Sequence, residues 1–218
     1  YVLMGGLPSV RKPAGGLLVY DLERSSGELL THEQLVPFQS IYSILELPDS
    51  LVLCGTRAEE GSDGSARLFL FDVVNRVVVD TYIPVEDAYD IRDMVITDDG
   101  LVFGVARVTD RNSNDPNAGI PMLFVFDPLN GEVVHLASLE SYSTQFGGMN
   151  DGGMLVAHGD SIYAFFPRTI VQIDARSLEH RALAAPPQAI TNAGVALDNR
   201  IYFAAGTNLW SFGTAEAA

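Results

Sequence analysis

The sequence predicts an all-β fold built from a repeated unit of antiparallel strands. An apolar strand ending in Phe-Asp, a short polar turn and a second strand recur along the chain, as in LFLFDVVNRVVVDTYI (68–83). The aspartates that mark the four copies are spaced by 51, 55 and 47 residues and are Asp21, Asp72, Asp127 and Asp174. This period is typical of a propeller blade rather than of a helical solenoid. Helical periodicity is not sustained over a dozen residues anywhere.

A predicted β-hairpin lies between successive copies of this unit. Each hairpin has flanks of β-branched and aromatic residues around a turn such as Pro-Asp-Ser or Asp-Asp-Gly, which suits tight turns. The four hairpins are SILELPDSLVLCG (43–55), DMVITDDGLVFGV (93–105), MLVAHGDSIYAFF (154–166) and GVALDNRIYFAAG (194–206). One complete repeat therefore holds four strands, two from the hairpin and two around the Phe-Asp turn.

The repeats assign the whole chain, 1–218, to one domain of five units. The units are expected at about 1–36, 41–84, 91–138, 153–185 and 193–213. Four-stranded antiparallel sheets repeated around an axis form a β-propeller, in which each sheet packs on the next. The first and last units lack a strand, so we expect either a five-bladed ring with an irregular seam or part of a six- to eight-bladed ring, and we favour the latter.

The repeated pattern resembles that of the quinoprotein-like and YVTN-type propeller superfamily. The resemblance rests on apolar strands ending in Phe-Asp and followed by a Gly or Arg turn, as in LFVFDPLNGEVV and LFLFDVVNRVVV, and it covers nearly the whole chain. These motifs specify a blade and not an activity. The Trp-Asp and Gly-His signatures of WD repeats are missing. The Trp-centred docking motif of the pyrroloquinoline-quinone dehydrogenases is missing too, apart from a lone Trp210.

Composition excludes some classes of partner. With 13 Lys+Arg against 28 Asp+Glu, the formal charge of −15 repels nucleic acid and acidic bilayer surfaces, so we expect no nucleic-acid binding. No apolar run approaches the roughly 18 residues needed to cross a bilayer, so we expect no membrane insertion. The acidity fits a soluble protein or one that binds cations. The single Cys54 excludes an internal disulfide, alternates with core residues and is expected to be packed. The compartment stays open, with secretion or a bacterial periplasm among the alternatives.

Two long polar connections point to one face of the predicted propeller. They are RAEEGSDGS (57–65) and RVTDRNSNDPNAG (107–119), whereas the turns of the opposite face are short. Long loops on a rigid scaffold often carry binding residues, although tolerated insertions look the same. Segments that enter each hairpin on this face supply aromatic, charged and amide side chains suited to a polar ligand. The predicted ligand-binding residues are Tyr42, Asp90, Arg92, Gln145, Asn150 and Asn192. For Arg92, a structural ion pair is the competing interpretation.

No catalytic residue or cofactor can be assigned from the sequence. Asp110, Asn112 and Asn114 match the first, third and fifth places of a calcium loop, but Asp115 and Pro121 replace the glycine and glutamate that such a loop requires. A solvated Asx-rich loop is therefore the preferred interpretation, and no cofactor is expected. The four histidines do not pair at metal-ligand spacing, and nucleophile-elbow and phosphate-loop motifs are missing.

The sequence thus favours a non-catalytic recognition module that binds a polar small molecule, a glycan or a protein. The alternative is a lyase or hydrolase domain that acts on a carbohydrate or lactone in the propeller funnel, with or without a divalent cation, an analogy at the level of fold.

Overall fold

The computed structural model describes residues 1–9, 12–109, 119–146 and 153–214. These residues form antiparallel sheets with one short helix, so the predicted all-β class is correct. They divide into two compact units, which we describe separately. Unit 1 comprises residues 1–94 and 106–108, and unit 2 comprises residues 95–105 and 109–218.

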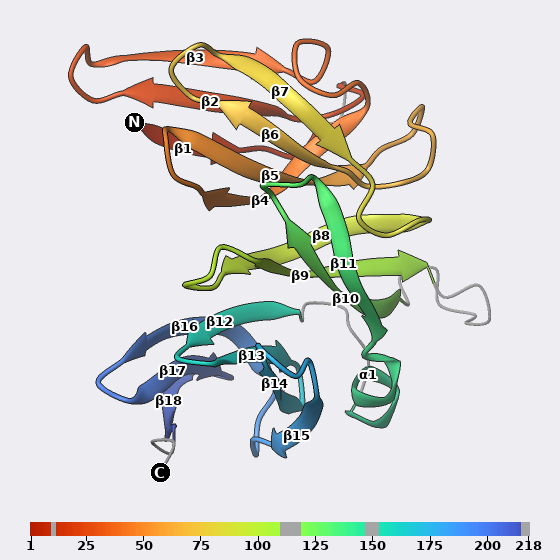
Figure 1. Ribbon diagram of the computed structural model, residues 1–218, viewed down its shortest axis with the longest axis vertical. Coiled ribbons are helices and arrows are strands. Elements are labelled where there is room, and N and C mark those ends of the chain that lie inside the picture. The colour runs from red at the N-terminus through yellow and green to blue at the C-terminus, as the bar shows by residue number, and fades with distance from the viewer. Residues whose placement is uncertain (10–11, 110–118, 147–152, 215–218) are drawn as a thin grey trace. The chain divides into compact units, whose positions relative to one another are not determined.

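Unit 1 contains two groups of strands (Figure 1). A three-stranded antiparallel sheet is formed by β1 (Val2–Gly5), β2 (Gly16–Asp21) and β3 (Ser26–Thr31). A four-stranded antiparallel group follows, with β4 (Gln39–Glu46), β5 (Leu51–Ala58), β6 (Leu68–Asp72) and β7 (Val77–Tyr82) in sequence order. Strand β8 (Ala88–Ile96) joins β5 through the pair Arg57 and Asp90.

Unit 2 contains the remaining strands and the helix, except for residues 106–108 of β9, which belong to unit 1. Beyond β8, the sheet continues with β9 (Val102–Thr109), β10 (Gly119–Asp127) and β11 (Glu132–Ser138). A four-stranded sheet has β12 (Met154–His158), β13 (Ser161–Phe166), β14 (Thr169–Asp174) and β15 (His180–Ala184). The last sheet has β16 (Ile190–Leu197), β17 (Arg200–Ala205) and β18 (Asn208–Gly213).

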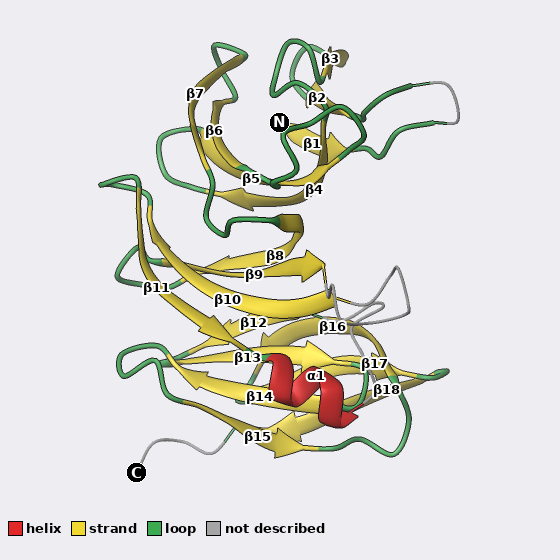
Figure 2. Ribbon diagram, turned by 90° about the vertical axis from the view of Figure 1, so that its right-hand side faces the viewer, coloured by secondary structure: helices red, strands yellow, loops and turns green. Residues whose placement is uncertain are grey.

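Helix α1 (Glu140–Phe146) was not predicted, because seven residues are too few to give a sustained helical pattern. It contacts β10, β13 and β14, and Figure 2 shows it against the strands of unit 2. No helix in the described part of the chain is long and apolar enough to cross a membrane.

The predicted hairpins are present as β4-β5, β8-β9, β12-β13 and β16-β17. Three of their first strands begin earlier than expected, however, at Gln39, Ala88 and Ile190 rather than at residues 43, 93 and 194. Register shifts interrupt β4 between Ile41 and Ser43 and also interrupt β16. Such bulges interrupt the alternation of apolar and polar residues from which a strand is predicted.

The four repeated aspartates initiate the turns that follow their strands. In each case Oδ1 accepts hydrogen bonds from the backbone N–H groups two and three residues later. For Asp72 these distances are 2.9 Å to Val74 and 2.8 Å to Asn75. Hydrogen bonds lower the pKa of all four carboxyl groups. The largest cause at Asp72 is the backbone N–H of Asn75, and the largest cause at Asp127 is the side-chain amide of Asn130.

We predict that Asp72→Ala lowers the Tm by a few degrees, whereas Asp72→Asn, which keeps the accepting oxygen, lowers it less. Because the folded pKa lies below the ordinary aspartate value of about 3.9, this stabilisation is complete above that value. It is lost as the pH falls through the lowered folded pKa. Melting curves between pH 7 and pH 2 would check both points. Equal effects of the two substitutions at pH 7 would contradict the turn assignment.

Alternate residues of the aspartate-ending strands face different neighbouring sheets. In unit 1, Phe69 and Phe71 of β6 are buried in a cluster with Leu17 and Val19 of β2. The two β6 residues stand one and three places before Asp72, the aspartate that ends β6. The two β2 residues stand two and four places before Asp21, the aspartate that ends β2. The two strands therefore bury opposite faces against each other.

Unit 2 repeats this rule. Val171 and Ile173 of β14 stand three places and one place before Asp174, and they share a buried cluster with Leu123 and Val125 of β10. A third cluster packs Trp210 and Phe212 of β18 against residues that include Ile170 of β14. The same register thus packs successive sheets in both units.

Candidate functional site

The predicted residues Tyr42 and Arg92 meet, although they lie on different strands, β4 and β8, both of which pair with β5. Arg92 Nη1 donates a hydrogen bond of 3.0 Å to the Tyr42 hydroxyl, and its guanidinium carbon lies 5.2 Å from the centre of the Tyr42 ring. Tyr42 is 37% exposed, while the Arg92 side chain is 9% exposed. The tyrosine therefore presents surface to solvent beside a fixed guanidinium group.

Asp90 is the buried anchor of this arrangement. Its carboxylate is fully buried, with one oxygen 2.9 Å from Arg92 Nε and the other 2.6 Å from Arg107 Nη2. Burial raises the pKa of Asp90, while the two guanidinium groups act in the opposite direction. Both carboxylate oxygens are used within the protein, so Asp90 orients the two arginines rather than offering itself to a ligand.

Tyr89 adds a second aromatic ring beside two arginines. The guanidinium carbons of Arg57 and Arg107 each lie 4.8 Å from its ring centre, within the range of cation–π interactions. Arg57 Nε is 3.6 Å from Glu59 Oε1, and both atoms are buried without a hydrogen-bond partner in the described structure. We call the following set the Arg92 cluster: Tyr42, Arg57, Tyr89, Asp90, Arg92 and Arg107.

A close approach of strands β4, β5 and β8 places the cluster. The Ser43 hydroxyl donates a hydrogen bond of 3.1 Å to the Ile91 carbonyl. A Cβ atom at Gly55 would lie 2.4 Å from Ser43 Oγ and 2.7 Å from Ile91 Cγ2, so glycine is needed there. These contacts fix the spacing of the strands that carry Tyr42, Arg57 and Asp90.

Gln39 tethers the polar connection between β5 and β6. Its side-chain amide donates to the Ser65 carbonyl at 3.0 Å and accepts from the Thr56 hydroxyl at 2.6 Å. Gln39 is 3% exposed and both ends of its amide are used within the protein, so it is a structural residue.

The other predicted residues have different outcomes. Asn192 lies on β16 of unit 2 and is exposed. The side chain of Gln145 and the whole of Asn150 lie outside the described residues, as do the calcium-loop candidates Asp110, Asn112 and Asn114. Tyr42, Asp90 and Arg92 were expected in connecting segments, and this was wrong, because they lie on strands.

Arg57 and Arg107 were not singled out as ligand-binding residues, although a signal was present. They begin the two long polar connections and occupy matching positions in the second strands of two predicted hairpins, LVLCGTRA (51–58) and LVFGVARV (101–108). Elsewhere, Cys54 is fully buried, as predicted, and burial raises the pKa of its thiol. Among the described residues, no group of three or more His, Cys, Asp or Glu could hold a metal ion.

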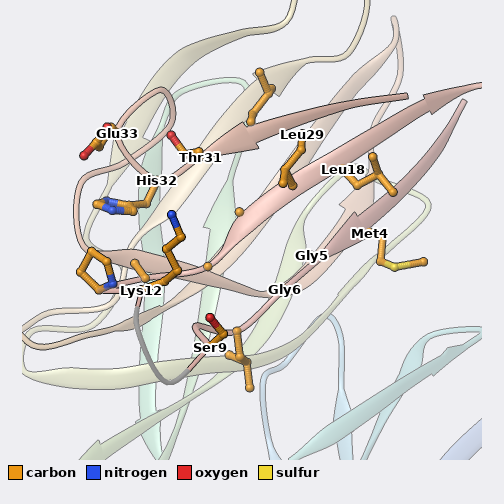
Figure 3. A pocket seen from close by; sticks show the side chains of 16 residues that line it. Met4, Gly5, Gly6, Ser9, Lys12, Leu18, Leu29, Thr31, His32 and Glu33 are labelled. Atoms are coloured by element: carbon orange, nitrogen blue, oxygen red, sulfur yellow. The ribbon is translucent and has the colours of Figure 1, made fainter. Parts of the chain in front are cut away.

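A separate cavity of about 470 Å³ lies against the β1-β2-β3 sheet (Figure 3). Met4, Leu18 and Leu29 are among its apolar residues, and Lys12 and His32 are among its polar residues. Leu18 stands three places before Asp21, as the buried Phe69 does before Asp72. The cavity therefore lies on the face of β2 that carries Leu18. The equivalent face of β6, which carries Phe69, is covered by the β1-β2-β3 sheet.

The comparisons with known proteins concern the fold. No protein-family model and no curated protein matches the chain. Among solved structures, the chain is similar to the extracellular domain of BT4673 from B. thetaiotaomicron. One structure describes that protein as a proposed one component system, and another as a proposed hybrid two component system. Each gives a TM-score of 0.60 at 12% identity over 93% of this chain, which spans about a quarter (26%) of the length of the other.

Proposed function

We propose that the chain is a non-catalytic recognition module of β-propeller type that binds a polar small molecule, a glycan or a partner protein at the Arg92 cluster. One observation carries the proposal: Arg92 is held between the buried Asp90 and the exposed Tyr42. Two ordered arginines beside aromatic rings form a rigid surface that needs little reorganisation on binding, and rigidity reduces the entropic cost of association.

The propeller assignment is supported by the repeated packing rule. The same register packs β6 against β2 in unit 1 and β14 against β10 in unit 2, and the other face of β14 packs against β18. Sheets that pack face to face through a repeated register are what propeller blades require. The quinoprotein-like and YVTN-type propellers remain the superfamily that the Phe-Asp strands favour.

The structural neighbours support a sensing or binding role by analogy. Both are described as extracellular domains of one component or hybrid two component systems. By the same analogy we propose that this module works outside the cytoplasm, as a periplasmic or secreted domain. The analogy is one of fold and is weaker support than the cluster itself.

We predict that Tyr42→Ala weakens glycan binding about tenfold, because the exposed ring would be a main contact of the ligand. Labelled wild-type and variant proteins would be compared on a glycan array. Tyr42→Phe, which keeps the ring and loses only the hydroxyl that accepts from Arg92, should lose less. Arg176→Ala, at an exposed ion pair of unit 2, is the control and should bind as wild type does. Unchanged binding by Tyr42→Ala to every glycan that the wild type recognises would contradict this site.

A further inference from the structure

We infer that the ligand of the Arg92 cluster is an acidic sugar, held by its carboxylate on the arginines and by its ring on Tyr42. The inference rests on the proposed function and adds the chemical class of the ligand. Three observations carry it: the local charge, the unused guanidinium donors and the exposed aromatic ring.

The cluster is positively charged in a strongly acidic chain. Arg57, Arg92 and Arg107 provide three positive charges, and the contacting Asp90 and Glu59 provide two negative charges. The site therefore keeps one net positive charge, although the chain as a whole carries −15. A local positive charge in an acidic surface favours an anionic ligand over a neutral one.

The guanidinium groups have donors to spare. Arg92 uses Nε for Asp90 and Nη1 for Tyr42, and within the described structure Nη2 has no hydrogen-bond partner. Within the described residues, Arg107 donates a side-chain hydrogen bond from Nη2 to Asp90 and none from its other guanidinium nitrogens. A planar guanidinium fork matches the two oxygens of a carboxylate, so this group of donors suits a carboxylate ligand.

The ring of Tyr42 points to a sugar rather than to a simple anion. The ring is exposed and its position is fixed by the hydrogen bond to Arg92. A flat aromatic face offers contact area to the apolar C–H side of a sugar, while the adjacent guanidinium reaches a charged substituent. Sulfate and phosphate share the charge of a carboxylate, but they have no ring to place on Tyr42.

The test is calorimetric titration of the whole chain with trigalacturonic acid and with the same trimer fully methyl-esterified. Esterification removes the charges and keeps the sugar rings. We expect the acid to bind about ten- to hundredfold more tightly than the ester, the range expected for hydrogen bonds to a charged group. Arg92→Gln should remove this preference, Arg92→Lys should keep part of it, and Arg176→Gln should behave as wild type. Circular dichroism would establish that each variant is folded.

The possible results separate the two proposals. Equal affinity for acid and ester overturns the acidic ligand and leaves the recognition function standing. If sulfate or phosphate binds as tightly as trigalacturonic acid, the inference that the ligand contains a sugar ring is overturned. If neither trimer binds and the glycan array is silent too, the proposed function fails with it.

Discussion

Asp90→Ala is expected to lower the free energy of unfolding by about 3–5 kcal/mol, the range for breaking a buried ion pair on one side. The reason is that Asp90 is fully buried and neutralises two arginines whose side chains are only 9% and 12% exposed. Without the carboxylate, Arg92 and Arg107 keep their charges in a poorly solvated place. Asp90→Asn keeps an accepting oxygen and should cost less than Asp90→Ala.

Urea denaturation followed by circular dichroism would measure this effect. Asp160→Ala is the matched control, because Asp160 pairs with Arg176 at 3.0 Å but both side chains are largely exposed. Exposed pairs contribute about 0–1 kcal/mol, so the control should stay near wild type. Similar small losses from both substitutions would show that Asp90 is not a buried anchor.

Phe71→Ala should also lower the free energy of unfolding by about 3–5 kcal/mol, the usual cost of truncating a buried phenylalanine. Phe71 is fully buried between β6 and β2, in the cluster that contains Leu17 and Val19. Removing the ring leaves a cavity between two sheets of unit 1. The effect should be a lower denaturation midpoint with an unchanged dependence on urea concentration.

Tyr20→Ala provides a control at the matching position of the repeat. Tyr20 stands directly before Asp21, as Phe71 does before Asp72, but it is only half-buried. We expect its truncation to cost about 1 kcal/mol, the centre of the range for point substitutions. A loss for Tyr20→Ala as large as that for Phe71→Ala would contradict the packing rule.

The strands could be predicted well from the sequence because their signals are local. Turn aspartates such as Asp72 and alternating apolar residues such as Phe69 and Phe71 report on their immediate neighbours. The early start of β4 could not be predicted, because the bulge after Ile41 breaks the alternation.

The candidate site was only partly predictable. Arg92 could be predicted as a site residue because aspartates flank it in the sequence. Arg107 could not, because it reaches Asp90 from another strand. Partnerships of this kind depend on how strands pair and not on local pattern. The positive charge of the cluster could not be predicted from the net charge of −15, because that value is a sum over the whole chain.

The most direct test of the account is to map where trigalacturonic acid binds, using backbone amide NMR shifts of the whole chain. We predict that the largest shift changes fall at Tyr42, Arg57, Tyr89, Arg92 and Arg107, and that they saturate together. Changes confined to residues that line the separate cavity, such as Met4, Leu18 and Leu29, would contradict the Arg92 cluster as the binding site.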